Sequence, residues 1–235
     1  MSWLARLEVD AESIHTEGIS NDIYAWHKRL WECYPDMPDA KRDFLTRIDH
    51  LEGTYRLWVL AQRKPVCPPW CPPAGFALNE IAPSFLTHRY YAFDLRANPV
   101  KTLARHGPNG ETLFKPNGKR KDGKRVPLVN QEELRAWLIR KGLVRCRDPQ
   151  TGIDVPGGFR FPPNKPLEIR PMVENHFHKK DKKTGKDHTA YHGGVQFRGT
   201  LEVTDQERFI ETYQAGIGSA KGFGFGLFLL APLKL

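Results

Sequence analysis

AGIGSAKGFGFGLFLLAPL, residues 215–233, places five glycines among the eleven positions from Gly216 to Gly226 and then continues as an apolar run. The preceding segment, DQERFIETYQA (205–215), is predicted to be a helix, and FGFGLFLLAPL (223–233) is predicted to be a strand. The local order is therefore helix, glycine loop, strand. This order determines how the end of the chain folds and which phosphates the loop can meet.

Glycine loops that hold a nucleotide cofactor have the opposite order, because a helix N-terminus must follow the loop and face the phosphate. Here Gly216 stands where a helix C-cap belongs, and the dipole of that helix end has the wrong sign for phosphate. No GKS or GKT sequence is present. We therefore expect no cofactor. With many N–H groups and one cation, Lys221, the loop suits the backbone of a phosphodiester chain that other elements hold.

The segments before this loop have the order strand, helix, strand, strand. THRYYAFDLRANPV (87–100) is predicted to be a strand that ends at Pro99, and a glycine-rich basic loop follows it. NQEELRAWLIRKG (130–142) is predicted to be a helix, with Asn130 as its N-cap and Gly142 as its stop. FRFPPNKPLEIRPMVENHFHKK (159–180) and AYHGGVQFRGTLEVTD (190–205) are predicted to be two long strands around a polar tip.

The first half has a similar order. SWLARLEVD (2–10) alternates as a strand does, and ISNDIYAWHKRLWECYP (19–35) is predicted to be a helix capped by Ser20. Its apolar residues at helical spacing, which predict one buried face, are Ile23, Trp26, Leu30 and Cys33. Paired strands are predicted in 43–65 with a turn at Glu52-Gly53, and a short strand in GFALNEIA (75–82). A second helix is only weakly marked here.

Each half thus has the element order of a βαββαβ unit. The expected fold class is α+β, with two tandem ferredoxin-like (RRM-like) domains. We place the N-terminal domain, which carries the helix at 19–35, at residues 1–83 and the C-terminal domain at residues 84–235. The match lies in element order alone, because the two halves share no repeated sequence.

The net charge of +9 is confined to the second half. Residues 1–117 hold 14 Lys and Arg against 14 Asp and Glu, whereas residues 118–235 hold 22 against 13. A polyanion is the expected partner, and nucleic acid is favoured over a membrane; the alternative is a solvated basic surface. No apolar run approaches the roughly 20 residues of a membrane helix, and the start turns polar too soon for a secretion signal, so we expect a cytoplasmic protein.

Two basic tracts supply most of this charge. KPNGKRKDGKR (115–125) has six Lys and Arg in eleven residues, and KKDKKTGK (179–186) has five lysines at a predicted hairpin tip. Flexible basic loops suit phosphate contacts, which supply affinity without reading bases. The tract at 115–125 favours RNA or DNA binding, whereas the tip at 179–186 is equally explained by solubility.

Metal ligands are not expected. Cys67 and Cys71 lie in PVCPPWCPP, and zinc would need two further ligands that no second cysteine pair supplies. His176 and His178 lie two apart on a predicted strand, with no Asp or Glu at matching spacing. A proline-stiffened turn and a polar hairpin are the favoured explanations.

Tyr24 and His27 lie one turn apart on the predicted first helix, beside its buried face. A histidine exchanges protons near neutral pH, and a tyrosine hydroxyl one turn away can position it or the group that it serves. Such pairs also occur on helices without any catalytic role, so the pair alone is a weak indication of catalysis.

Several stretches together resemble one family. They are YAWHKRLWECYP (24–35), FDLRANPVKT (93–102), GKRVPL (123–128), GVQFRGTLEVTD (194–205) and GIGSAKGFGFGLFLLAPL (216–233). The last is similar to the glycine-rich loop of the RAMP superfamily, and the whole set resembles the CasE family, the CRISPR RNA-processing endoribonucleases of type I-E Cascade. The resemblance spans nearly the whole chain in the same order.

The resemblance implies metal-independent cleavage of CRISPR repeat RNA, retention of the 3′ hairpin of the mature crRNA, and membership of the Cascade complex. The family's catalytic histidine falls on His27, as base or acid, and its helix tyrosine on Tyr24. The residues assigned to RNA binding are Lys28, Lys115, Lys119, Arg120, Lys121, Lys124, Arg125, Gly216, Gly218, Lys221, Gly222 and Gly224. The tip at 179–186 is longer and more basic than the family leads us to expect.

In the implied reaction the 2′-OH attacks the adjacent phosphate and leaves a 2′,3′-cyclic phosphate and a 5′-OH. A base, an acid and a cation suffice for this chemistry. Two rivals stay open: a non-catalytic RNA-binding Cascade subunit of the same superfamily, and a metal-dependent nuclease that uses His176 and His178.

Overall fold

The computed structural model describes residues 2–16, 23–36, 42–118, 121–147, 150–151, 153–171, 175–180, 187–192 and 194–234. Within these ranges the backbone alone is described at residues 23–24, 147, 175–180 and 187–192.

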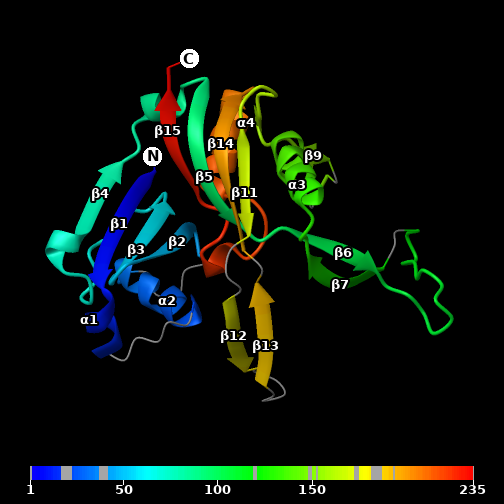
Figure 1. The fold of residues 1–235 in the computed structure, drawn as a ribbon, viewed down its shortest axis with the longest axis horizontal. Coiled ribbons are helices and arrows are strands. Elements are labelled where there is room, and N and C mark those ends of the chain that lie inside the picture. Colours follow the sequence, from blue (N-terminus) through cyan, green and yellow to red (C-terminus); the bar gives the residue numbers. More distant parts are fainter. Residues whose placement is uncertain are drawn as a thin grey trace.

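Four antiparallel strands form the first sheet, in the order β2–β3–β1–β4 (Figure 1). They are β1 (Trp3–Asp10), β2 (Phe44–Leu51), β3 (Thr54–Ala61) and β4 (Phe76–Glu80). The predicted strands and the turn at Glu52-Gly53 are confirmed, and Gly53 takes a φ of +66° that few other residues adopt. Because β1 lies between β3 and β4, the sheet has the arrangement of a split βαβ unit.

Helix α2 (Ile23–Leu30) and the 3₁₀ turn η1 (Trp31–Cys33) cover one face of this sheet. The predicted buried face is confirmed at Trp26, Leu30 and Cys33, all at most 1% exposed, whereas Ser20 and the side chain of Ile23 lie outside the described residues. Trp26 packs on Tyr55 of β3 with ring centroids 5.2 Å apart. A short helix, α1 (Ala11–Thr16), precedes α2.

The weakly marked second helix of the first domain does not form. Residues 62–75, between β3 and β4, are all described and contain only the 3₁₀ turn η2 (Pro73–Gly75). Five prolines in these fourteen residues explain this, because proline lacks the N–H donor that a helix interior needs.

The second sheet has the order β10–β14–β5–β15, and β11 also pairs with β14. Its strands are β5 (Tyr90–Ala97), β10 (Phe159–Arg160), β11 (Leu167–Pro171), β14 (Val195–Val203) and β15 (Phe228–Leu233). Helices α3 (Gln131–Leu143) and α4 (Gln206–Ala215) pack against it. Asn130 accepts hydrogen bonds from the N–H groups of Glu132 and Glu133, which confirms it as the N-cap of α3. Two tandem α+β domains of the ferredoxin-like type are therefore present.

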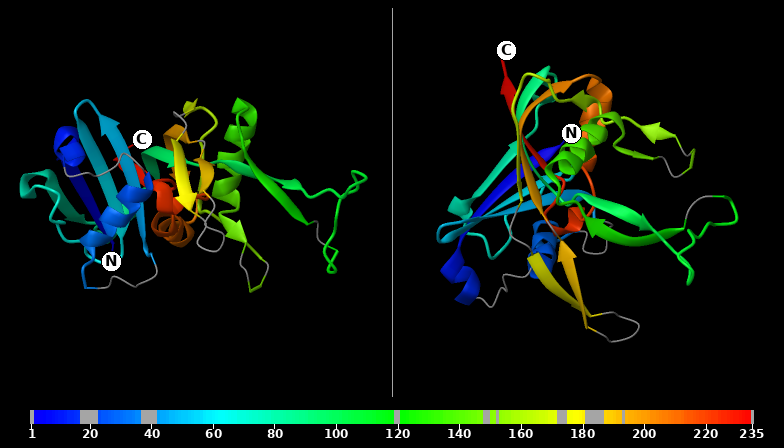
Figure 2. Two further views of the ribbon diagram at one scale, coloured as in Figure 1. Left: turned by 90° about the horizontal axis from the view of Figure 1, so that it is seen from below. Right: turned by 45° about the vertical axis from the view of Figure 1, so that its right-hand side comes forward.

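The basic segment after β5 is not the loop that we expected. It forms a hairpin of β6 (Val100–Ala104) and β7 (Asp122–Pro127), which projects away from the body of the molecule (Figure 2). A second small hairpin, β8 (Cys146–Arg147) with β9 (Asp154–Val155), follows α3.

The two long strands predicted in the second half are each broken. Residues 159–180 divide into β10, β11 and β12 (Asn175–Lys180), because Pro162, Pro163 and Pro166 interrupt the ladder. Residues 187–205 divide into β13 (Asp187–His192) and β14. Strands β12 and β13 pair only with each other, as a separate hairpin beside α2 (Figure 1). Of the tip predicted at 179–186, residues 179–180 belong to β12 and residues 181–186 lie outside the described residues.

The face of the first sheet opposite α2 packs on the second domain, where Leu45 and Leu60 join its core. The 3₁₀ turn η3 (Pro83–Leu86) connects the two sheets, and the boundary at residue 83 stays a proposal. Arg47 of β2 is the main polar contact: its guanidinium donates to Asp49 Oδ1 at 2.8 Å and to Asp94 Oδ1 of β5 at 2.8 Å. The Arg47 side chain is only 4% exposed.

We predict that Arg47→Met lowers the free energy of unfolding by about 1–3 kcal/mol, because it removes one buried, charged hydrogen-bond donor from each of Asp49 and Asp94. The loss is limited because Asp49 keeps its ion pair with Arg96 and Asp94 keeps its ion pair with Arg198. Denaturant unfolding measures this. Arg63→Met is the matched control, because the partner of Arg63, Asp43, is well exposed and such a pair contributes about 0–1 kcal/mol. Equal losses in the two variants would contradict this role of Arg47.

Candidate functional site

His27 lies near the C-terminal end of α2, where this helix meets the glycine loop. Its imidazole is half-buried, and its centroid lies 6.4 Å from that of Phe223 in the 3₁₀ turn η4 (Lys221–Phe223). The buried Nδ1 atom has no hydrogen-bond partner within the described part of the chain. The two candidate elements from opposite ends of the sequence, the helix and the loop, therefore meet at His27.

Arg42, just before β2, is a site residue that the sequence analysis missed. A Cβ atom built on Gly222 would lie 2.5 Å from Arg42 Nη1 and 3.9 Å from His27 Cε1, so both side chains face the loop at Gly222. Among the described residues no carboxylate forms an ion pair with Arg42. No local signal marks this residue, because only the fold brings it beside His27.

The electrostatics of this pair favour a neutral imidazole. Burial lowers the pKa of His27 below its ordinary value, and the positive charge of Arg42 lowers it further. Burial also lowers the pKa of Arg42. A neutral histidine can accept a proton at neutral pH, and an unpaired guanidinium beside it can stabilise an anion.

The glycine loop is shaped for close approach. Gly216 caps α4 as predicted, with a φ of +70° and its N–H donating to Thr212 O at 2.8 Å. A side chain at Gly216 would strike Leu45 of the first sheet, at 2.7 Å. Gly218 would meet Trp137, whereas the nearest atom to a Cβ at Gly224 is 3.9 Å away. The loop therefore fits between the two domains, and at Gly222 the guanidinium of Arg42 lies directly against the loop backbone.

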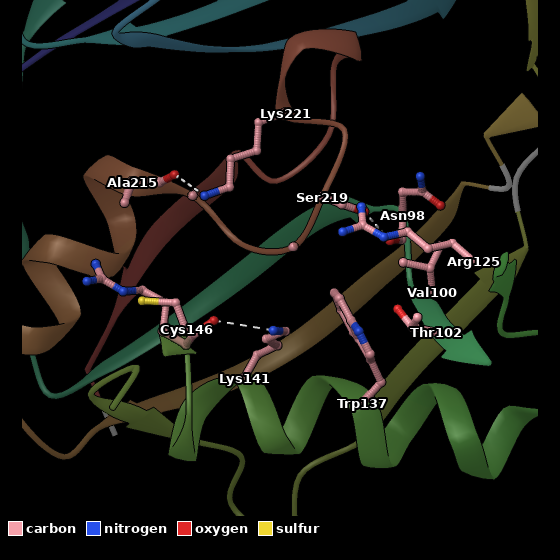
Figure 3. Close-up of a pocket in the computed structure, with 13 residues that line it drawn as sticks. Asn98, Val100, Thr102, Arg125, Trp137, Lys141, Cys146, Ala215, Ser219 and Lys221 are labelled. Carbon is pink, nitrogen blue, oxygen red and sulfur yellow. Dashed lines mark hydrogen bonds between the residues drawn. The ribbon is translucent and has the colours of Figure 1, made fainter. Parts of the chain in front are cut away.

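Lys221 lines a pocket that does not include His27. Its Nζ atom donates to Ala215 O at 2.6 Å, and Arg125 lines the same pocket (Figure 3). Burial lowers its pKa, and the nearby Arg145 and Arg42 lower it further. The adjacent residues Lys221 and Gly222 of η4 thus belong to two different sites. Lys221 lines the pocket, and Gly222 lies beside Arg42 and His27.

The other predicted cations are spread over the surface. Lys28 is exposed on α2, and Lys124 lies on the projecting hairpin β6–β7. Lys115 and Lys121 flank the tip of that hairpin, where Lys115 pairs with Asp122 at 3.1 Å. Lys119 and Arg120 lie outside the described residues. The structure therefore brings Arg125 and Lys221 together and leaves the rest of the tract away from His27.

Tyr24 lies on α2 one turn before His27, and its side chain is outside the described residues. The same holds for the side chains of His176 and His178, although their strand β12 passes beside α2. Among the described residues no three His, Cys, Asp or Glu side chains gather as metal ligands. Burial raises the pKa of the Cys71 thiol to about 12. None of the described helices has the length and apolarity to span a bilayer.

Comparison with known proteins gives consistent matches over the whole length. A family model described as CRISPR associated protein matches residues 2–232. CasE, a CRISPR system Cascade subunit of Escherichia coli K12, is 31% identical over 220 residues, 91% of this chain and 94% of CasE. The CRISPR-associated endoribonuclease Cse3 of Thermus thermophilus is 26% identical over 238 residues, 98% of this chain and 100% of Cse3.

A solved structure shares the fold. Thermus thermophilus Cse3, bound to an RNA representing a pre-cleavage complex, is similar with a TM-score of 0.65 at 23% identity, over 98% of this chain and 99% of that one. This similarity agrees with the two tandem ferredoxin-like domains described above.

We predict that the imidazole of His27 titrates below its ordinary pKa of about 6.5 and that Arg42→Gln moves the midpoint upward. Removing the like charge makes protonation less unfavourable, so the pKa rises. NMR titration of the histidine side chains measures both. His50 is the internal control: burial first, and then Arg96, lower its pKa, so it should not respond to Arg42. A His27 midpoint unmoved by Arg42→Gln would contradict the pairing.

Proposed function

Because this chain belongs to the CasE family of CRISPR-associated proteins, we propose that it cleaves precursor CRISPR RNA within the repeats and stays bound to the 3′ hairpin of the product as a Cascade subunit. The observation that carries the proposal is the placement of a half-buried histidine, His27, beside Arg42 at Gly222, where Arg42 forms no ion pair with any described residue. We expect it to act in the cytoplasm.

The proposed reaction is transesterification without a metal. Neutral His27 takes the proton of the 2′-OH, and the 2′ oxygen forms a bond to phosphorus while the bond from phosphorus to the 5′ oxygen breaks. The 5′ oxygen takes a proton and leaves as a hydroxyl, and the other product ends in a 2′,3′-cyclic phosphate. The lowered pKa of His27 favours the role of base over that of acid.

Arg42 and Gly222 supply the rest of the described site. The guanidinium of Arg42 stabilises the extra negative charge on the phosphate oxygens during attack, where a desolvated cation acts most strongly. Gly222 carries no side chain, so a phosphate can approach both groups. Tyr24, one turn from His27 on α2, is the proposed partner that positions the reacting groups or protonates the leaving oxygen.

Affinity comes from the basic second domain. Arg125 and Lys221 lie together at the glycine loop. The protein hairpin β6–β7, which projects from the molecule (Figure 2), carries further cations that can contact the phosphates of an RNA stem. CasE of Escherichia coli carries the name of a Cascade subunit, and we assign the same association to this chain.

The second candidate is a non-catalytic RNA-binding Cascade subunit. The basic surface fits both candidates equally well, because it supplies affinity and not chemistry. The position of Arg42 beside His27 favours the nuclease, since RNA binding alone does not require a cation beside a neutral histidine.

We predict that the wild-type protein cleaves its repeat RNA in EDTA and that His27→Ala lowers the cleavage rate at least 100-fold, in line with the roughly 10²–10⁴-fold contribution of a general base. Gel analysis of the products, with identification of the 2′,3′-cyclic phosphate end, measures this. His27→Ala should still bind the RNA. Loss of wild-type cleavage in EDTA would instead support a metal-dependent nuclease, and undiminished cleavage by His27→Ala would sink the mechanism.

We predict that Arg42→Ala lowers the cleavage rate of bound RNA by about 10²–10³, the loss typical of removing one group that stabilises developing charge. Its effect on affinity should be small, because it removes one phosphate contact among many. Arg42→Lys keeps the cation and should retain part of the rate, and Lys165→Gln removes one surface charge without touching the site. A parallel loss of rate in Lys165→Gln, or a loss of affinity alone in Arg42→Ala, would contradict the role of Arg42.

A further inference from the structure

A basic pocket lies against the glycine loop, and His27 is not among the residues that line it (Figure 3). Its volume is about 430 Å³, in the range of sites that hold small ligands. One wall is α3, another is the turn into β8, and a third is the loop itself from Gly216 to Lys221. The hairpin β6–β7 closes the remaining side.

Four cations line this pocket: Arg125, Lys141, Arg145 and Lys221. No carboxylate is among the lining residues, all of which belong to the described part of the chain. The nearest acidic partner is Glu211 of α4, whose Oε2 lies 3.5 Å from Arg145 Nη2 and which also pairs with Arg208. Arg125, Lys141 and Lys221 therefore form no ion pair with any described residue, and Arg145 shares Glu211 with Arg208.

The hydrogen bonds of these cations leave their charge available. Lys141 Nζ donates to Arg145 O at 3.3 Å, and Lys221 Nζ donates to Ala215 O at 2.6 Å, both neutral carbonyl acceptors. The buried Nε atom of Arg145 has no partner among the described residues. Burial lowers the pKa of Lys141, and the charge of Arg140 lowers it further, as expected for a lysine without an anion.

The pocket and the His27 site share one turn of chain. Lys221 points into the pocket, whereas a side chain at the next residue, Gly222, would meet Arg42 and approach His27. The charge of Arg42 also lowers the pKa of Lys221, so the cations of the two sites interact electrostatically. A phosphodiester chain that crosses the loop at Gly222 passes from one to the other.

We propose that this pocket is a second phosphate site, which holds a phosphate of the RNA strand next in the chain to the one cleaved at His27. The proposal rests on the proposed function and adds Lys141 and Arg145 to the residues that hold the substrate. By gripping the strand beside the scissile bond, the pocket sets which phosphate lies at His27 and retains the product after cleavage.

The first experiment compares the double variant Lys141→Gln/Arg145→Gln with the wild type in RNA binding and single-turnover cleavage. The double variant should bind the repeat RNA about tenfold more weakly, and its slope of log affinity against log salt should fall by about 1, as for the loss of one phosphate contact. At saturating RNA it should cleave at neighbouring phosphates as well as at the wild-type position, because the pocket no longer sets which phosphate lies at His27.

Two controls separate the pocket from general charge and from folding. Lys165→Gln removes one exposed positive charge of the same domain outside the pocket, and its salt slope should equal that of the wild type. Arg145→Lys keeps the charge and should retain most of the wild-type affinity for the repeat RNA. A double variant that binds and cleaves like Lys165→Gln would overturn the proposal.

The second experiment uses Cys146, an exposed free thiol that lines the pocket. Alkylation of Cys146 by iodoacetamide, followed by mass spectrometry, should slow when the protein binds repeat RNA whose cleavage is blocked by a 2′-deoxy nucleotide. Cys67, half-buried in the first domain, is the internal reference and should react at an unchanged rate. Equal alkylation of Cys146 with and without bound RNA would show that the strand does not enter the pocket.

The third experiment locates the phosphate. Single phosphates around the cleavage position are replaced by uncharged methylphosphonates. Replacing one phosphate next to the scissile phosphate should weaken RNA binding by the wild type but not by the double variant. If the wild type neither binds nor cleaves the repeat RNA, the proposed function fails; if it does both but no neighbouring phosphate behaves in this way, only the second site fails.

Discussion

Arg96 of β5 connects the glycine loop to the first sheet. Its carbonyl oxygen accepts from the N–H of Gly226 at 2.7 Å, and its guanidinium donates to Ile48 O of β2 at 2.5 Å and pairs with Asp49 at 2.8 Å. The loop must meet α2, which is carried by the first sheet, whereas the loop itself belongs to the second domain. One residue thus fixes the loop to both domains, so that Gly222 lies opposite His27.

The positive charges of this protein divide into two kinds by their partners. Arg47 is paired with Asp49 and Asp94, and Arg89 and Arg160 share the one carboxylate of Glu202, so these cations are held by carboxylates. Lys141 and Lys221 instead donate to carbonyl oxygens, which hold the side chain without removing its charge. Cations of the first kind stabilise the folded chain, and those of the second kind remain available to phosphate. Composition alone does not separate them.

Most regular elements follow from local patterns. Asn130 caps α3 where its sequence predicts, α4 forms within the helix predicted at 205–215, and strand β1 follows its apolar alternation. The strands whose length was predicted wrongly lie where local and distant partners compete for the same segment. The segment at 159–180 has the composition of a long strand, yet its prolines end the ladder with β14 and the last part pairs with β13 instead.

The sequence by itself determined the fold class, the order of elements around the glycine loop, the half of the chain that carries the charge, and His27 as the candidate catalytic residue. The first three depend on spacing or composition within a short window, whereas His27 follows from the resemblance to the CasE family. Only the tertiary structure decided that Arg42 lies beside His27, and that Lys141 and Arg145 face Lys221 across a pocket. Such contacts join residues far apart in the chain, and packing between separate elements brings them together.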